Sequence, residues 1–480
     1  MTLPLRATAF ERYMLKDDRP SHPMTYTIRL KFLGQIDRAA FDAAVDRGVR
    51  RHPLLCAHLV GDRPSQLTWV EASNPFPYVD YGDETKPLRF PGTEQIDLRT
   101  HTGLRIWVRG GDERTELRFQ FHHCCCDGLG AYRLIEDVLC AYHMALCPDD
   151  CDVTFRPLDP ELLGARMRFG LAWWRVLLRL PLEIWGAVVG LTMFLLVRPQ
   201  PLVAPERPVE EDADSPLLLD LPAHTFEADE SDRLRDAARA AGATMNDLLL
   251  RDLLLAMHKW NTSLDPRTSG RLMRVMIPMN LRSAGEDAMP AANVIGMVNL
   301  DRWLKWFRNP SRLLTSIAWE TRILQYFRFA LAFIRCIALL ERIPGGLEFM
   351  TRTNRCYATS VLSNLGRILG HAPLPRREGK LVAGGLLLES IESAPPVRSF
   401  VATGLTCLYY CGRLTVVQNY DRHYFTPQAA AQLMALTVRQ ILNSAGPGAE
   451  LPATLSRPTA LASTSRLDAA IAGVTPAALT

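Results

Sequence analysis

The sequence lacks a long apolar run without charges. Its longest such run, Ile184 to Val197, has 14 residues. As a helix this run would span roughly 21 Å, which is short of the about 30 Å of a bilayer's hydrocarbon core. The N-terminal segment carries charged side chains from Arg6 onward and contains no apolar stretch typical of a signal peptide. We therefore expect a cytoplasmic protein without an ordinary membrane-spanning helix.

An excess of one charge and a disulfide framework are also missing. The chain has 55 Lys and Arg against 51 Asp and Glu, so its net charge of +4 gives no bulk preference for nucleic acid. Three of its eleven cysteines, Cys124, Cys125 and Cys126, are adjacent, and adjacent residues cannot together satisfy disulfide geometry. This cysteine usage is typical of a reducing compartment.

Motifs of several large enzyme classes are absent as well. The chain contains no GxSxG string, no Walker A string and no HExxH string. The sequence therefore offers no support for a serine hydrolase, a P-loop nucleotidase or a zinc protease of those types. Its 480 residues, 48% hydrophobic and 22% charged, are typical of a soluble globular chain of about two to four domains.

The residues that are present predict a first half of mixed helices and strands. Asp37 can cap a helix whose apolar residues Phe41, Val45 and Val49 recur at every fourth position, and we expect Pro53 to end it. Short alternating runs follow, and then an apolar helix over about 129–146.

A second mixed half begins near His224. Thr244 can cap a strong, mostly apolar helix over 248–260. Strand-like runs return at 274–278, 384–388 and 405–417.

Composition divides the chain into four predicted segments. The division is a first domain over 1–165, an apolar helical insertion with a Pro-rich and acidic linker over 166–222, a second domain over 223–444 and a disordered tail over 445–480.

The segment TELRFQFHHCCCDGLG, at 115–130, carries the strongest candidate chemistry. Leu117, Phe119 and Phe121 alternate with polar residues, a pattern typical of a half-buried strand. If that alternation continues, His123 lies on the apolar face and His122 on the polar face. A neutral imidazole at the end of a buried strand can open onto a cavity and take a proton from a hydroxyl or an amine.

Other interpretations of this segment remain open. A buried histidine is most often a hydrogen-bonded core residue, and His and Cys together can also bind a metal. A cysteine of the run could act as a thiolate nucleophile beside His123, although consecutive side chains point in different directions. Asp127 could be a catalytic acid, but a buried carboxylate more often pairs with an arginine. We predict no metal site.

The segment HHCCCDG resembles the HHxxxDG signature of the chloramphenicol-acetyltransferase-like acyltransferases. That superfamily includes peptide-synthetase condensation domains, bacterial wax ester synthase/diacylglycerol acyltransferases and alcohol acetyltransferases. Further motifs follow in the family's order: RHPLL at 51–55, ATMND at 243–247, IPMNLR at 277–282 and SNLG at 363–366. The resemblance covers most of the chain, from about Leu5 to Ile441. The plant-type DFGWG motif is absent.

The resemblance implies an α/β (α+β) pseudo-dimer of two acetyltransferase-like domains. Each domain has a mixed sheet with flanking helices, and an active-site tunnel lies at their interface. His123 matches the family's general base, and Asp127 matches its structural aspartate, which pairs with an arginine of the second domain at the position of Arg282. His122 belongs to the same motif, and Asn280 lies in the strand-end motif that contains Arg282. Gly128 gives backbone room beside the reacting carbonyl, and its N–H can stabilise the oxyanion.

The implied reaction needs an acyl thioester and an acceptor but no resident cofactor. The donor is acyl-CoA or a carrier-protein thioester, and the acceptor is a small molecule or a lipid, with a hydroxyl expected before an amine. Because the sequence includes no adenylation or carrier domain, we expect a free-standing, monomeric enzyme. A non-catalytic relative that only binds a lipid or a carrier protein is the alternative.

Two apolar segments are candidates for an interface. Residues 166–198 contain Trp173, Trp174 and Trp185 beside Arg175 and Arg179, and residues 311–342 repeat the combination of aromatics and arginines. Pro181 is expected to kink the first helix. Both segments could be helices of the core or between the domains. The alternative is contact with the inner face of a membrane, where Arg and Trp suit the headgroup boundary.

Overall fold

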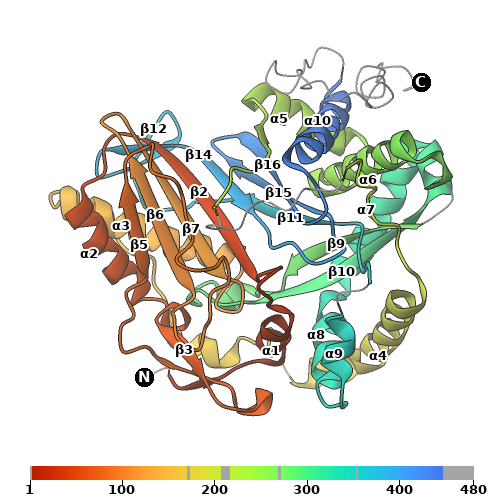
Figure 1. Cartoon of the computed structure of the whole chain (residues 1–480), viewed down its shortest axis with the longest axis horizontal. Coiled ribbons are helices and arrows are strands. Elements are labelled where there is room, and N and C mark those ends of the chain that lie inside the picture. The colour runs from red at the N-terminus through yellow and green to blue at the C-terminus, as the bar shows by residue number, and fades with distance from the viewer. Residues whose placement is uncertain (1–2, 170–172, 207–216, 269–271, 353–354, 447–480) are drawn as a thin grey trace.

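Two large mixed sheets stand side by side and form the frame of the molecule (Figure 1). The computed structural model describes residues 3–169, 173–206, 217–268, 272–352 and 355–446. The first sheet has the strand order β12-β13-β14-β2-β7-β6-β5, and the second has the order β10-β9-β11-β15-β16-β8. A small third sheet has the order β1-β4-β3.

The first sheet takes strands from both halves of the chain. Its strands are β2 (Thr25–Leu33), β5 (Tyr78–Gly82), β6 (Leu104–Gly110), β7 (Arg114–His122), β12 (Arg376–Arg377), β13 (Lys380–Ala383) and β14 (Leu386–Ala394). Strand β14 pairs antiparallel with β2, with Leu387 opposite Leu33. The composition of the sequence did not indicate that strands of the second half join the first sheet. The predicted domain boundaries stay predictions.

Helices of the first half form as the sequence predicts, with one correction. Helix α2 (Arg38–Val49) begins where the Asp37 carboxylate accepts a hydrogen bond from the amide of Ala40 at 2.8 Å. It ends at Val49 and not at Pro53, which instead starts a short 3₁₀ turn because a proline is well tolerated at a helix start. Helix α2 packs on α3 (Gly128–Leu146) so closely that a Cβ at Gly48 would lie 2.7 Å from Val138 Cγ2.

The N-terminal segment closes the base of the first sheet. Helix α1 (Ala9–Asp17) begins with a capping box between Thr8 and Glu11. The small sheet beside it consists of β1 (Leu5–Arg6), β3 (Ala57–Val60) and β4 (Thr68–Glu71).

The second sheet carries its helices on its outer side. Its strands are β8 (Ala223–Thr225), β9 (Leu272–Asn280), β10 (Ile295–Trp303), β11 (Ser360–Arg367), β15 (Thr403–Tyr410) and β16 (Arg413–Tyr420). Its helices are α5 (Ala228–Ala240), α6 (Met245–Leu264), α7 (Pro310–Tyr326) and α10 (Pro427–Ser444). Thr244 and Asp247 form the predicted capping box of α6. The run at 405–417 is a hairpin and not one strand, and Gly412, at φ +78°, forms its turn.

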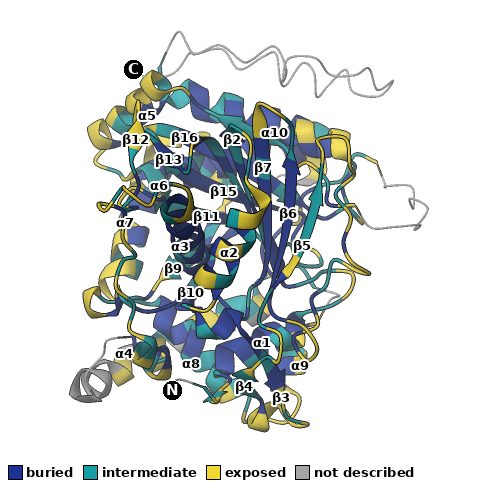
Figure 2. Cartoon of the chain, turned by 90° about the vertical axis from the view of Figure 1, so that its left-hand side faces the viewer, coloured by how far each residue is buried: buried dark blue, intermediate teal, exposed yellow. Residues whose placement is uncertain are grey.

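Three further helices lie below the second sheet in Figure 1. They are α4 (Trp173–Leu196), α8 (Ala330–Leu340) and α9 (Gly346–Met350). Helix α4 packs on α8, and α8 packs on β10 and α1. Figure 2 shows that buried residues concentrate in the sheets and in the inner faces of the helices. The predicted α/β architecture of two mixed sheets with flanking helices is confirmed.

Candidate active site

Strand β7 ends at the histidine pair, and its two faces have different surroundings. The predicted alternation is present, but residues of both faces are buried, because loops also cover the polar side. His122 is completely buried, and its Nδ1 accepts a hydrogen bond from the amide of Cys124 at 3.1 Å. Its Nε2 therefore carries the proton, and it lies 3.4 Å from Asp18 Oδ2. Burial opposes ionisation of Asp18, but hydrogen bonds from His122, Met24 and Gln95 outweigh it and lower the pKa of this carboxyl.

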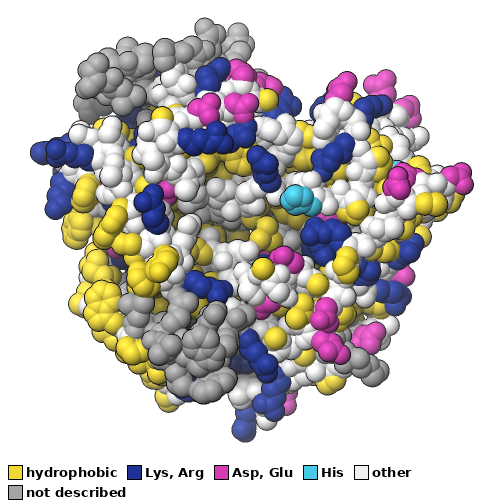
Figure 3. Space-filling model, turned by 180° about the vertical axis from the view of Figure 1, so that it is seen from behind, with side chains coloured by type: hydrophobic (Ala, Val, Ile, Leu, Met, Phe, Trp, Pro, Cys, Tyr) yellow, Lys and Arg dark blue, Asp and Glu magenta, His cyan; other side chains and the backbone are white. Residues whose placement is uncertain are grey.

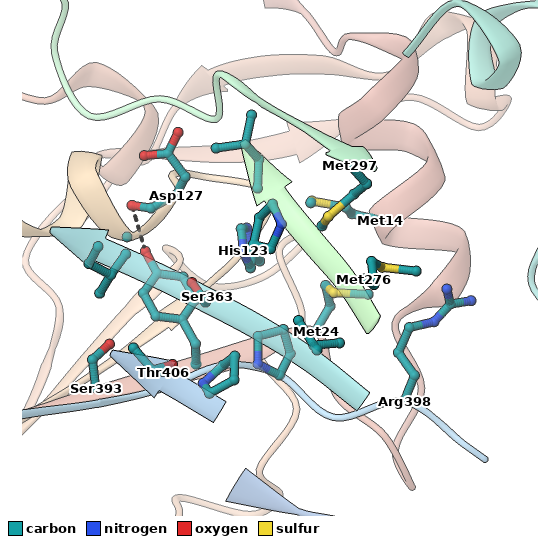
Figure 4. Close-up of a pocket in the computed structure, with 18 of the residues that line it drawn as sticks. Met14, Met24, His123, Asp127, Met276, Met297, Ser363, Ser393, Arg398 and Thr406 are labelled. Atoms are coloured by element: carbon teal, nitrogen blue, oxygen red, sulfur yellow. Dashed lines mark hydrogen bonds between the residues drawn. The ribbon is translucent and has the colours of Figure 1, made fainter. Parts of the chain in front are cut away.

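His123 points the other way, into a cavity between the two sheets. Figure 4 shows its ring among Met14, Met276 and Met297. Burial lowers the pKa of the imidazole below 6.5, although a hydrogen bond to its own backbone carbonyl and the charge of Asp127 oppose this shift. The ring is therefore neutral at pH 7. A neutral imidazole has one unprotonated ring nitrogen, which can accept a proton from a substrate.

The carbonyl of His123 is also held from the second half of the chain. Asn293 Nδ2 donates a hydrogen bond to this carbonyl at 2.8 Å, and Asn293 Nδ2 lies 3.4 Å from His123 Nδ1. The ring of Tyr26 packs edge-on against the imidazole, with 5.0 Å between ring centroids. Sequence reasoning did not find Asn293 or Tyr26, because neither residue belongs to a motif that the sequence presents.

Asp127 joins the two halves. It caps α3, where its Oδ1 accepts a hydrogen bond from the amide of Gly130 at 2.9 Å. Arg282 donates to it in a bidentate manner, from Nη1 to Oδ2 at 2.8 Å and from Nη2 to Oδ1 at 3.1 Å. The amide of Val294 donates to Oδ2 at 2.9 Å. The predicted ion pair is confirmed, and it leaves Asp127 no free role as a proton donor.

Asn280 and Gly128 lie beside this ion pair. Asn280 Oδ1 accepts a hydrogen bond from the amide of Arg282 at 3.1 Å, so Asn280 helps to orient the arginine. Gly128 lines the cavity, and a Cβ added to it would lie 2.9 Å from a methyl group of Leu365. Gly130 is the more constrained glycine, because its Cβ would lie 3.1 Å from the backbone of Ala292. The catalytic roles of His122, His123, Asp127, Gly128 and their supports stay predictions.

The RHPLL motif fixes the loop that supplies these contacts. The ring of His52 is completely buried, and its Nδ1 accepts a hydrogen bond from the amide of Ala291 at 2.8 Å. Its Nε2 lies 3.2 Å from Asp137. Burial lowers the pKa of His52 and keeps it neutral. Ala291 directly precedes Ala292 and Asn293. The contact with His52 therefore positions the loop that hydrogen-bonds to both Asp127 and His123.

The three adjacent cysteines are core residues. All three are completely buried free thiols. Burial raises the pKa of Cys124 and Cys125 well above 9, and that of Cys126 to about 12. A thiol held neutral in this way is a poor nucleophile, which disfavours the thiolate interpretation. Within the described part of the chain, no three His, Cys, Asp or Glu side chains lie close enough together to hold a metal ion.

The cavity is mainly apolar and has few polar groups. Its volume is about 160 Å³. Its polar lining includes His123, the amide side chains of Asn280 and Asn364, and two carboxylates that are each paired with an arginine: Asp127 with Arg282, and Asp17 with Arg398 at 2.9 Å. Hydroxyl groups come from Ser363, Ser393, Thr406 and Tyr26, among others.

No protein-family model matches the chain. It is 30% identical over 156 residues to the vanchrobactin synthetase of Vibrio anguillarum, a match that covers 29% of this chain and 5% of the synthetase. It is 27% identical over 299 residues to an uncharacterized protein of Mycobacterium tuberculosis, a match that covers 59% of this chain and 63% of that protein. The matched regions are thus less than two thirds of the length of these relatives.

Solved structures agree over almost the whole chain. The first condensation domain of the calcium-dependent antibiotic synthetase superposes with a TM-score of 0.66 at 14% identity, over 94% of this chain and 98% of that domain. The starter condensation domain of rhizomide synthetase, in complex with C8-CoA and Leu-SNAC, superposes with a TM-score of 0.61 at 13% identity, over 92% and 94% of the two chains. The chain therefore has the same fold as these condensation domains.

Proposed function

We propose that the protein is an acyltransferase that moves an acyl group from a thioester to a hydroxyl acceptor. The observation that carries this proposal is the position of His123, a neutral imidazole at a mainly apolar cavity between the two sheets. A donor thioester is either acyl-CoA or a carrier-protein thioester. The complex of the rhizomide starter domain with C8-CoA supports a thioester donor in this fold.

His123 would act as the general base. Its unprotonated ring nitrogen takes the proton of the acceptor hydroxyl while the hydroxyl oxygen attacks the thioester carbonyl. The N–H of Gly128, at the start of α3, is a candidate donor to the resulting oxyanion, where the helix N-terminus favours negative charge. The C–S bond then breaks, the imidazolium returns its proton to the departing thiolate, and an ester and a free thiol leave. No covalent acyl-enzyme forms.

The charge of the cavity supports a hydroxyl rather than an ammonium acceptor. Asp17 and Asp127 are the two carboxylates that line it, and each is bound by an arginine. Neither is therefore free to attract a cationic amine, while hydroxyl and apolar side chains suit an uncharged alcohol.

Amide formation is the second candidate, and the comparisons are what favours it. The structures with the same fold reported above are condensation domains of peptide synthetases. An amine acceptor would use the same base and the same donor. A protein that only binds a thioester or a lipid in this cavity is the third possibility.

A membrane surface is the proposed source of an apolar acceptor. Several large apolar side chains of α4 and α7 are exposed, among them Trp185 (62%), Trp319 (67%) and Tyr326 (80%). Figure 3 shows hydrophobic side chains gathered on the side of the molecule where α4, α7 and α8 lie. This exposure disfavours a purely internal role for both segments, and it suits contact with a lipid surface. The side chains of Trp173, Trp174, Arg175 and Arg179 lie outside the described residues.

In the described part of the chain, no single helix has the length and apolar character to span a membrane. Helices α7 and α8 meet the length and composition criteria only as a pair, which is bent by 61°. On the exposure of Trp185, Trp319 and Tyr326, we propose that this surface makes peripheral contact with the inner face of a membrane.

Product analysis tests the proposed reaction. Purified protein is incubated with acetyl-, octanoyl- or hexadecanoyl-CoA and with a pool of alcohols and, separately, a pool of amines. Mass spectrometry should find esters that depend on His123, with free CoA released in equal amount. Amides without esters would establish the second candidate, and thioester binding without any product would establish the third.

A further inference from the structure

A second apolar cavity lies behind the candidate active site. It lies between α4, α7, α8 and the paired strands β9 and β10, its volume is about 390 Å³, and it is partly open to solvent at Trp185 and Val189. Apolar side chains make up most of its wall: Trp185, Val189, Leu191, Met193, Phe194, Leu324, Phe329, Ala332 and Met350 among others. The proposed reaction does not use this space.

The two cavities share one wall. Met276, Met297 and Phe333 line both of them. Methionine is unbranched and flexible, so the two methionine side chains can move aside for a ligand more easily than branched residues can. The partition between the cavities is therefore made of side chains and not of backbone.

The register of β9 and β10 makes this path continuous. Residues directly opposite in an antiparallel pair point to the same face, and this face continues at every second residue. The face begins at Asn280, opposite Ile295, beside Arg282, and it ends at Arg274, opposite Asp301. The six residues from one end to the other correspond to about 20 Å of strand. One face of this pair of strands thus leads from the catalytic end to the far end of the second cavity.

Close contacts hold α8 and α4 beside this pair of strands. A Cβ at Gly296 of β10 would overlap the carbonyl of Ala330, so α8 can approach the strand only because this residue is glycine. Gly296 lies opposite Met279, so this contact is on the other face of the strand pair from the cavity. A Cβ at Gly186 of α4 would lie 2.6 Å from the ring of Phe329, which lines the cavity. These contacts fix the positions of α8 and α4 beside the cavity.

The far end of the cavity is closed by charges that are already paired. Arg274 donates to Asp301 from Nε at 2.6 Å and from Nη2 at 2.7 Å. Glu320 is bound by Arg302 at 2.6 Å. Because these charged side chains are already paired with each other, they do not favour a charged ligand. The apolar side chains of the walls favour an apolar ligand.

We propose that this second cavity binds the long alkyl chain of the substrate that reacts at His123. The inference rests on the proposed function and assigns its substrate class, a long-chain acyl thioester or a long-chain alcohol. The chain passes Met276 and Met297 and lies along the β9–β10 face, with its reactive end at His123. Each methylene buried there should tighten binding about fourfold.

A substitution that fills the cavity tests this assignment. Ala332 is 6% exposed and lines only the second cavity, so Ala332→Trp should occupy the space of the chain. Leu339, on the same helix and 59% exposed, gives the matched control Leu339→Trp. The ratio of kcat/KM for hexadecanoyl-CoA to that for acetyl-CoA, with a short alcohol, should fall tenfold or more in Ala332→Trp and should not change in Leu339→Trp.

A second arm distinguishes the two sources of the chain. It uses acetyl-CoA with hexadecanol in place of ethanol. A loss in the first arm assigns the cavity to the donor, and a loss in this arm assigns it to the acceptor. An unchanged ratio in both arms would overturn the proposal. If Ala332→Trp does not fold, as judged by circular dichroism, Cys336→Phe in the same wall replaces it.

A binding measurement separates this inference from the proposed function. Calorimetric titration of the His123→Ala variant with hexadecanoyl-CoA, acetyl-CoA and hexadecanol needs no turnover. Binding of hexadecanoyl-CoA or of hexadecanol that is weakened at least tenfold by the added Ala332→Trp supports the cavity assignment even if no ester ever forms. Equal affinity for both long-chain compounds with and without Ala332→Trp would overturn the assignment even if acyl transfer is confirmed.

Discussion

The polar wall of the catalytic cavity and the apolar wall of the second cavity behind it are built in opposite ways. In the polar wall, at β7 and α3, polar groups are hydrogen-bonded to each other: Asp127 to Arg282, and the carbonyl of His123 to Asn293. In the apolar wall, at α4 and α8, most side chains are apolar, and Trp185 is exposed at its outer edge. Directional bonds fix one geometry for the chemistry, whereas apolar contacts tolerate ligands of different length. The comparison therefore assigns the reaction to one wall and the substrate to the other.

The largest expected effect concerns the polar wall. His123→Ala should lower kcat/KM for acyl transfer by a factor of roughly 10²–10⁴, because a general base contributes about that much. Product formation measured by mass spectrometry, with unchanged thermal unfolding, checks this. His122→Ala is the matched comparison and should cost less, because the ring of His122 contacts Asp18 and not the cavity. Near-normal turnover of His123→Ala would show that His123 in this wall is not the general base.

The second effect is on stability. Removing either Asp127 or Arg282 by alanine substitution should lower the free energy of unfolding by about 3–5 kcal/mol, because the partner is left buried and unpaired. Urea unfolding followed by circular dichroism measures the loss. Arg50→Ala, which breaks an exposed ion pair with Asp46, is the control and should cost less than about 1 kcal/mol. Equal losses of unfolding free energy on breaking the two ion pairs would show that the Asp127–Arg282 pair is no more stabilising than an exposed ion pair.

Much of the polar wall was predictable from the sequence, because its residues lie in short motifs. The alternation of 117, 119 and 121 predicted the strand and the direction of His123, and the resemblance implied the pairing of Asp127 with Arg282. Asn293 was not predictable, because an asparagine after two alanines carries no local pattern. Nor was the pairing of β14 with β2, since the same alternation suits a strand of either sheet.

The apolar wall was predictable only in composition. The sequence indicated that residues 166–198 and 311–342 are apolar and aromatic, but periodicity alone does not distinguish a helix that covers a core from one that faces lipid. The second cavity depends on how α4 and α8 approach β10. That approach depends on single glycines such as Gly296, whose packing partner is distant in sequence.

The smallest expected effect concerns the outer edge of the apolar wall. Trp185→Ser should weaken association with vesicles of phosphatidylcholine and phosphatidylglycerol at least about tenfold, because burial of one large apolar side chain contributes about 1.5–3 kcal/mol. Vesicle co-sedimentation measures it. Tyr78→Ser, on β5 of the first sheet and 43% exposed, is the control and should have no effect. If wild-type protein does not sediment with vesicles at physiological salt, the lipid surface is excluded as the source of the acceptor.

The pH dependence of acyl transfer tests the central claim most directly, since it separates a base from a residue that only supports the fold. His123 must be neutral to accept a proton, and burial lowers its pKa below 6.5. We predict that kcat/KM is constant above about pH 7.5 and that its acidic midpoint lies below 6.5. Below the lowered pKa it should fall tenfold per pH unit, and this acidic limb should be absent from the residual activity of His123→Ala. A midpoint at or above 6.5, or the same acidic limb in His123→Ala, would contradict the claim that His123 is the base.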